Sequence, residues 1–196
     1  MIELPIVDEL DINGWDIKKA LGLLLKPNPV LLEWLSSPER YMWNNGICDD
    51  LISFSKRVTH GAACLYHYLH LGERQFSVYI DGKDLVGLKK YFYVVRPAMA
   101  LRWLRMNPDI APPMNFQALM NGTDIPPDLQ GVLLELLEAK SLSKEIGEAP
   151  RIKEIDEFIV SELEWAKSAG PTSTKAAANL SGEADDLFRS ILKRVW

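Results

Sequence analysis

The sequence predicts an α+β protein that is mostly α-helical. Two observations favour this class: a short alternating pattern of apolar residues near the N-terminus, and apolar residues at helical spacing along most of the remaining chain. The composition is that of an ordinary folded protein, with 47% hydrophobic and 25% charged residues among 196. A chain of this length can bury a sizeable core. We therefore expect one or two N-terminal strands followed by a helical body.

The strand signal lies at residues 2–12. Ile2, Leu4 and Ile6 alternate with other residues, and further apolar residues follow up to position 12, which is typical of a strand or a strand pair. Asn13-Gly14 is a dipeptide common in turns, so we expect the strand region to end there. No other segment gives a comparable strand signal. The backbone groups of the first strand are therefore expected to find partners outside this chain.

Helical patterns account for most of the remaining chain. Asn28 can cap a helix and Pro29 suits a first helical turn, so a second helix is expected soon after the first one ends against Pro27. Pro97 is expected to kink the longest helix, because it removes one backbone hydrogen bond. The expected helices span residues 15–26, 28–35, 49–57, 61–76, 85–107, 115–121, 127–142 and 151–167.

The C-terminal part is predicted to be a linker followed by one more helix. The stretch "SAGPTSTKAAANLSG" is small and polar, as linkers are, whereas "EADDLFRSILKRVW" has apolar residues at helical spacing, with acids first and bases last. We expect this amphipathic helix to dock on the body, and a partner protein is the alternative receptor for it. The expected divisions of the chain are 1–36, a helical domain at 37–168, a linker at 169–182 and the helix at 183–196.

The composition argues against an overall nucleic-acid-binding charge, a zinc site and a membrane-spanning segment. The net charge of -5 gives no overall attraction to nucleic acid, so phosphate contacts need a local basic cluster. Cys48 and Cys64 lack CxxC spacing, and His60, His67 and His70 lack the acid pairing of a metalloprotease, so zinc is disfavoured. Without a basic leader or a run of about 18 apolar residues, we expect a cytoplasmic protein that has no membrane partner.

Acidic residues gather on the predicted N-terminal strand. Asp8, Glu9 and Asp11 lie close together, and strand alternation places Asp11 on the same side as Glu9. Carboxylates on a rigid strand can hold Mg²⁺, which prefers oxygen ligands. The alternative is a solvated edge strand whose charges protect it from aggregation. The residues alone leave both interpretations open.

Basic and aromatic residues share the helix predicted at 85–107. Lys89, Tyr93 and Arg96 fall at i, i+4 and i+7, which places them on one face. Such a face can bind phosphates, with lysine as a point charge and arginine as a two-pronged donor. Alternatively, the aromatic residues pack in the core while the bases extend to water. The basic residues are Lys89, Lys90, Arg96, Arg102 and Arg105, and the aromatic residues are Tyr91, Phe92, Tyr93 and Trp103.

Several blocks, taken in order, resemble one family. The blocks "ELDINGWDIKKALGLLLKPNPVLLEWLSSP", "YHYLHLG", "GLKKYFYVVRPAMALRWL", "PPMNFQALM" and "GEAPRIKEIDEFI" are similar to those of the predicted nucleotidyltransferases of the RNA-ligase-associated group, within the polymerase-beta-like superfamily. The likeness covers residues 2–196. The combined blocks are specific, whereas each block alone is weak.

The resemblance implies a fold, a cofactor and site residues. In that superfamily a mixed sheet carries a Gly-Ser turn, an Asp-x-Asp strand and a later third carboxylate, which together bind two Mg²⁺ ions at the reacting phosphate. It implies that Asp11 is the third carboxylate, both catalytic and metal-binding. It also implies that Lys89, Lys90 and Tyr91 contact the triphosphate of a nucleoside triphosphate, and that Arg96 braces the same helix.

The sequence departs from the family pattern before Asp11. No Gly-Ser turn and no Asp-x-Asp segment occurs in the 196 residues. The resemblance therefore implies a remnant of the catalytic sheet at 1–36, and Mg²⁺-dependent nucleotidyl transfer that this chain does not perform alone. The acceptor is expected to be RNA or protein. The missing strands are expected to come from a separate protein chain, or from a longer reading frame of which this chain is a fragment. The alternatives are a non-catalytic nucleotide- or protein-binding remnant and a pure interaction module.

Overall fold

The computed structural model describes residues 2–8, 11–58, 60–142, 147–170 and 179–195. The chain divides into two units, one made of Met1–Thr59 with Lys175–Trp196 and the other of His60–Thr174. Most described residues are helical and the described strands form two two-stranded sheets, which confirms an α+β, mostly α fold. The units therefore divide after residue 59, whereas we expected a boundary after residue 36. None of the described helices is long and apolar enough to cross a membrane.

The first unit begins with a β-hairpin. Strand β1 (Ile2–Glu3) pairs antiparallel with β2 (Asn13–Gly14), and the Leu4 amide donates to the Ile12 carbonyl at 3.1 Å. Two N-terminal strands are present as expected, but each has only two residues, and β1 finds its partner within the chain. The prediction that Asp8 and Asp11 lie on a strand is wrong, because both lie in the segment between β1 and β2. The prediction that Asn13-Gly14 forms a turn is wrong. The chain turns earlier, where Asp8 has a φ of 50°, a conformation that aspartate tolerates better than most residues.

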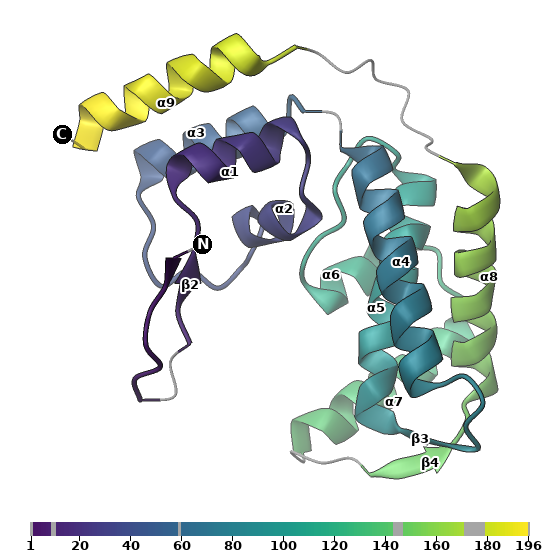
Figure 1. Cartoon of the computed structure of the whole chain (residues 1–196). Helices are drawn as coiled ribbons and strands as arrows, with labels where there is room; N and C mark the ends of the chain where they lie inside the picture. The colour runs from purple at the N-terminus through teal and green to yellow at the C-terminus, as the bar shows by residue number, and fades with distance from the viewer. Residues whose placement is uncertain (1, 9–10, 59, 143–146, 171–178, 196) are drawn as a thin grey trace. The chain divides into compact units, whose positions relative to one another are not determined.

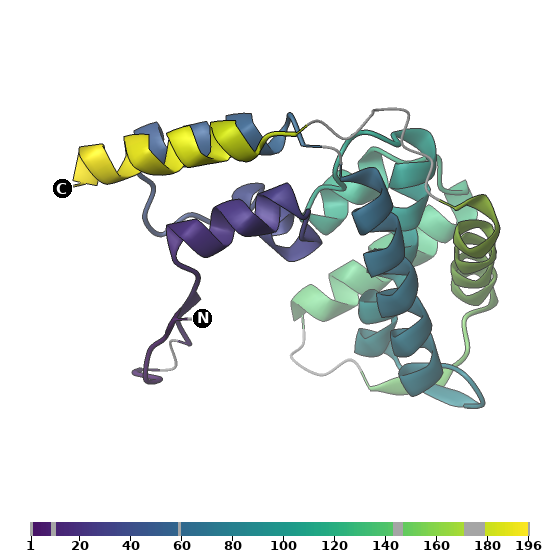
Figure 2. The same cartoon turned by 45° about the horizontal axis from the view of Figure 1, so that its top comes forward.

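Four helices complete the first unit: α1 (Ile17–Leu25), α2 (Pro29–Leu35), α3 (Asn45–Ser55) and α9 (Ser181–Val195). The helix expected at 49–57 begins earlier, because the Asn44 side chain accepts a hydrogen bond from the Ile47 amide and caps α3. Helix α9 lies along α1 and α3 (Figure 2). Arg194 Nη2 lies 2.7 Å from Asp50 Oδ2, and Arg57 pairs with Glu183. The C-terminal helix thus docks on the first unit of its own chain.

Capping at Asn28 gives a testable contribution to stability. Its side-chain oxygen accepts from the Leu31 amide at 3.2 Å at the start of the short helix α2. We expect Asn28→Ala to lower the free energy of unfolding by about 1 kcal/mol, because that amide loses its partner. Urea unfolding followed by tryptophan fluorescence measures the change, since the stacked Trp15 and Trp34 rings belong to the same region. Asn28→Ser retains an acceptor and should stay near the parent; equal stability of all three proteins would contradict the prediction.

The second unit is built on three long helices. Helices α4 (Gly61–Tyr79) and α5 (Leu88–Met106) pack side by side, and α8 (Lys153–Ala169) contacts both (Figure 1). Helix α6 (Phe116–Asn121) packs on α5, and α7 (Pro127–Leu142) packs on α8. Side chains less than 2% exposed include Leu65, Tyr68, Tyr91, Met99, Leu101, Leu104, Leu119, Leu129 and Leu133. Helix α5 supplies much of this core, and it continues through Pro97.

A second small sheet differs from the sequence prediction. Strand β3 (Leu85–Gly87) pairs antiparallel with β4 (Glu148–Pro150), with Val86 opposite Ala149. The helix expected at 85–107 therefore begins at Leu88, and the helix expected at 151–167 begins at Lys153. Both strands have three residues, too few for an alternating pattern to be distinguished from helix starts. Of the expected linker at 169–182, residues 171–178 lie outside the described residues, and residues 181–182 begin α9.

Candidate functional site

The acidic candidate residues lie in the N-terminal hairpin. Asp11 is exposed, and its Oδ1 accepts a hydrogen bond from Asn13 Nδ2 at 2.8 Å. Asp8 is exposed at the turn, and Glu9 lies outside the described residues. Among the described residues, no group of three or more histidine, cysteine or acidic side chains is placed to hold a metal ion. A single exposed carboxylate does not provide the ligand set that Mg²⁺ needs, so the described residues do not fit this ion.

The basic candidates Lys89 and Lys90 form the first turn of α5 in the second unit. Both are half-buried. They lie at the N-terminus of α5, which is the positive end of the helix dipole. Lys90 Nζ lies 4.9 Å from the ring centroid of Tyr79 and 5.3 Å from that of Tyr93. The two rings are 6.0 Å apart and tilted by 37°. The fold thus adds Tyr79, from the end of α4, to the basic start of α5.

Tyr91 and Arg96 make contacts within the second unit. Tyr91 is fully buried, and its hydroxyl accepts a hydrogen bond from the Ile152 amide at 2.8 Å. Burial raises the pKa of this phenol, so it stays neutral. Arg96 is half-buried, and its Nε and Nη2 donate to the Met114 carbonyl at 3.3 and 3.2 Å. These contacts tie Tyr91 to the start of α8 and Arg96 to the segment at Met114, and Arg96 is half-buried like Lys89 and Lys90.

Arg102 belongs to an internal ion cluster. Its Nε donates to Glu162 Oε1 at 2.8 Å and its Nη1 lies 3.0 Å from Asp124 Oδ1. Hydrogen bonding to Glu162 raises the pKa of the guanidinium, and the same guanidinium lowers the pKa of Asp124. Arg105 Nη1 lies 3.8 Å from Glu162 Oε1. Arg102 is therefore paired inside the protein, whereas the two alternatives for this helix placed its bases on phosphates or in water.

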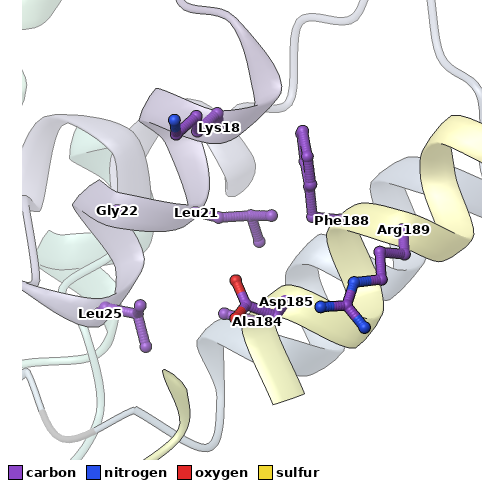
Figure 3. A pocket seen from close by; sticks show the side chains of 8 residues that line it. All are labelled: Lys18, Leu21, Gly22, Leu25, Ala184, Asp185, Phe188 and Arg189. Atoms are coloured by element: carbon purple, nitrogen blue, oxygen red, sulfur yellow. The ribbon is translucent and has the colours of Figure 1, made fainter. Parts of the chain in front are cut away.

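A pocket of about 500 Å³ lies in the first unit between α1 and α9 (Figure 3). Leu21 points from α1 toward α9, and the Phe188 ring rises from α9 beside it. Lys18 contributes a positive charge from α1, and Asp185 and Arg189 contribute charges of both signs from α9. The remaining lining residues are Gly22, Leu25 and Ala184. Sequence reasoning missed this pocket because its walls come from opposite ends of the chain; the apolar faces of both helices were the only available signal.

The cysteine and histidine residues do not add a described metal site. Cys48 and Cys64 are free thiols, and Cys64 is buried. His60 is buried at the start of α4, the His67 ring packs edge-on against Tyr68 at 5.0 Å, and His70 lies 3.4 Å from Glu73. Packing and local polar contacts thus account for His67 and His70 as the sequence predicts.

The fold and the site define a mostly helical protein with a basic and aromatic start to the helix α5 and an acidic N-terminal hairpin. Residues 1–190 match the model of a family described as the RNA repair pathway DNA polymerase beta family, RlaP, and the chain belongs to this polymerase-beta-like family. It is 36% identical over 196 residues to the uncharacterized protein YcgL of Bacillus subtilis (strain 168), a match that covers all of this chain and 75% of YcgL. No solved structure matches the chain.

Proposed function

We propose that the chain is part of a nucleotidyltransferase that transfers a nucleotidyl group from a nucleoside triphosphate to RNA. The observation that carries this proposal is the family match across residues 1–190. The proposal of an RNA acceptor is supported by the family description, which names an RNA repair pathway. A protein acceptor is the alternative that the same chemistry allows.

Within this proposal, Lys89 and Lys90 contact the triphosphate. They lie in the first turn of α5, where the helix dipole also favours an anion. Tyr91 holds the start of α8 through its hydrogen bond to the Ile152 amide, and Arg96 holds the segment at Met114. Tyr91 and Arg96 then act as positioning residues, because their observed contacts are to the protein's own backbone.

Asp11 is proposed as one acidic ligand of a catalytic Mg²⁺ that needs further carboxylates. The hairpin itself supports the idea of a larger sheet. Its large aliphatic side chains are between 51% and 70% exposed, and a two-stranded sheet is marginally stable alone. These residues are Ile2, Leu4, Ile6, Val7 and Ile12. We propose that strands from another segment or chain cover them and bring the other carboxylates, so that this chain alone is inactive.

Nucleotide binding is tested by thermal unfolding of the whole chain with each nucleoside triphosphate and Mg²⁺. A nucleotide at about 100 times its Kd stabilises the native state by about 2.7 kcal/mol, which raises Tm by roughly 5–10 °C for a chain of this size. We expect this rise to disappear in the double variant Lys89→Ala/Lys90→Ala, because the triphosphate loses both charges. Lys56→Ala/Lys193→Ala removes two exposed lysines from the first unit and should keep the rise. No rise with any nucleotide would contradict the binding role.

A second candidate function is nucleotide or protein binding without catalysis. The observation that favours it is the lack of a metal-binding group among the described residues. Nucleotide binding would then persist while no pyrophosphate is released, even after the hairpin is joined by further strands. Both functions predict that a nucleotide raises Tm. Only the nucleotidyltransferase predicts that pyrophosphate is released.

A further inference from the structure

We propose that Tyr79, Tyr93 and Lys90 form a stacking platform for single-stranded RNA. The platform rests on the proposed function in one respect, that the acceptor is RNA; its geometry is independent of that proposal. Tyr79 ends α4, and Tyr93 follows Lys90 by three residues on α5. The tyrosine rings lie 6.0 Å apart, with the Lys90 ammonium within 5.3 Å of both centroids.

The exposure of this aromatic pair distinguishes it from the core of the same unit. Tyr68 and Tyr91 are at most 1% exposed, whereas Tyr93 is 48% exposed. Tyr79 is half-buried, and its neighbour Val78 is 52% exposed, so the pair is partly open to solvent. Leaving aromatic and aliphatic area in water forgoes the stabilisation that burial gives. An exposed aromatic pair beside a cation is a recognised kind of ligand surface.

The chemistry of the platform suits unpaired bases. Every base has a flat face that can stack on an aromatic ring, and the strand's phosphates bind nearby cations. Lys83 lies at the same end of α4, where its Nζ donates to the Val78 carbonyl at 2.7 Å, and Lys89 adjoins Lys90. Asp81 and Asp84 are exposed in the connecting turn, so the positive charge is local. A phosphate backbone is therefore guided to the lysine side of the rings.

At the two tyrosine rings the surface is partly open, which favours a strand there over the base of a single nucleotide. The triphosphate proposed above contacts the lysines and not the rings. Small ligands are held in sites that bury most of their area, whereas a strand gains affinity from successive partial contacts. Paired RNA is disfavoured, because its bases are stacked on one another and its major groove is closed to side chains. The platform thus predicts binding to unpaired RNA with little dependence on base identity.

Fluorescence anisotropy tests the platform with the full chain and a labelled oligouridylate of about 10 nucleotides, without nucleoside triphosphate or Mg²⁺. We expect binding at low salt, and we expect Tyr93→Ala to weaken it about tenfold, because one stacking partner is lost. Tyr93→Phe keeps the ring and should bind like the parent. Lys90→Ala should weaken binding and make it less sensitive to salt, because one phosphate contact is lost.

Tyr66→Ala is the matched control. Tyr66 is also on α4 and is also 48% exposed, so its loss removes equal aromatic exposure away from the platform. It should leave RNA affinity unchanged, and circular dichroism melts verify that each variant folds. Absence of binding, parent-like affinity of Tyr93→Ala, or equal affinity for blunt double-stranded RNA would each overturn the platform. Nucleotide-induced stabilisation without RNA binding would reject the platform alone, and RNA binding without any nucleotide effect would reject the nucleotide-binding role alone.

Discussion

Replacing Glu162 by alanine is expected to lower the free energy of unfolding of the second unit by about 3–5 kcal/mol. Glu162 is 0% exposed on α8, and its Oε1 accepts from Arg102 Nε at 2.8 Å. The Arg102 side chain is only 16% exposed, so its charge cannot return fully to water when the carboxylate is removed. The loss is large because the mostly buried Arg102 charge keeps only the exposed Asp124 as its partner, and because a small cavity is left.

The matched control for this change is Glu157→Ala, also on α8. Glu157 pairs with Lys153 at 3.6 Å, but both side chains are well exposed, so we expect a change of about 0.5 kcal/mol or less. The double variant Arg102→Met/Glu162→Met removes both charges and should be more stable than Glu162→Ala. Urea unfolding followed by circular dichroism measures all three. A loss below about 1 kcal/mol for Glu162→Ala would contradict this account and show that Asp124 and water are sufficient partners for Arg102.

Replacing Asp11 by asparagine should have a small effect in this chain alone and a large effect once the rest of the proposed sheet is present. In the chain alone, Asp11→Asn is expected to leave Mg²⁺ affinity nearly unchanged, because one exposed carboxylate holds the ion poorly. We define the completed protein as this chain joined to the part of YcgL that lies outside the match, in the order found in YcgL. In the completed protein, Asp11→Asn should reduce the rate of pyrophosphate release by more than roughly 100-fold. Loss of a residue that only supports a metal ligand lowers activity roughly 10–100-fold, and loss of a ligand itself should lower it further.

Asp8→Asn is the matched control for Asp11→Asn. Both acids belong to the hairpin and both are exposed, and asparagine tolerates the positive φ at position 8. We expect Asp8→Asn to retain most of the release in the completed protein. Equal losses in the two variants would mean that the charge of the hairpin matters rather than a ligand at position 11. A large loss of Mg²⁺ affinity on Asp11→Asn in the chain alone would show that its metal site is more complete than we propose.

Local sequence patterns predict most of the helices. The cap at Asn28 and the helical spacing of apolar residues place α2, α6 and α7 close to their observed bounds. Strands β3 and β4 could not be predicted in this way, because pairing between residues 85–87 and 148–150 creates them. The turn predicted at Asn13-Gly14 is absent for a related reason, because the pairing of these residues with Ile2 and Glu3 overrides their turn propensity.

The candidate site shows the same division between local and distant information. The basic residues of α5 are visible in the sequence, but Tyr79 joins Lys90 and Tyr93 only because α4 and α5 pack together. The partner of Arg102 lies 60 residues away on α8, so its ion pair could not be predicted from spacing. The family resemblance grouped Tyr91 with the two lysines, whereas packing directs its ring into the core.

Mg²⁺-dependent pyrophosphate release tests the central claim most directly, that this chain is a nucleotidyltransferase component whose acidic site requires further strands. The chain alone and the completed protein are compared with each nucleoside triphosphate and a single-stranded RNA acceptor. We predict no release by the chain alone, release by the completed protein, and its loss when Mg²⁺ is chelated. Release by the chain alone would contradict the claim of incompleteness, and no release by the folded completed protein with any nucleotide would contradict the catalytic role.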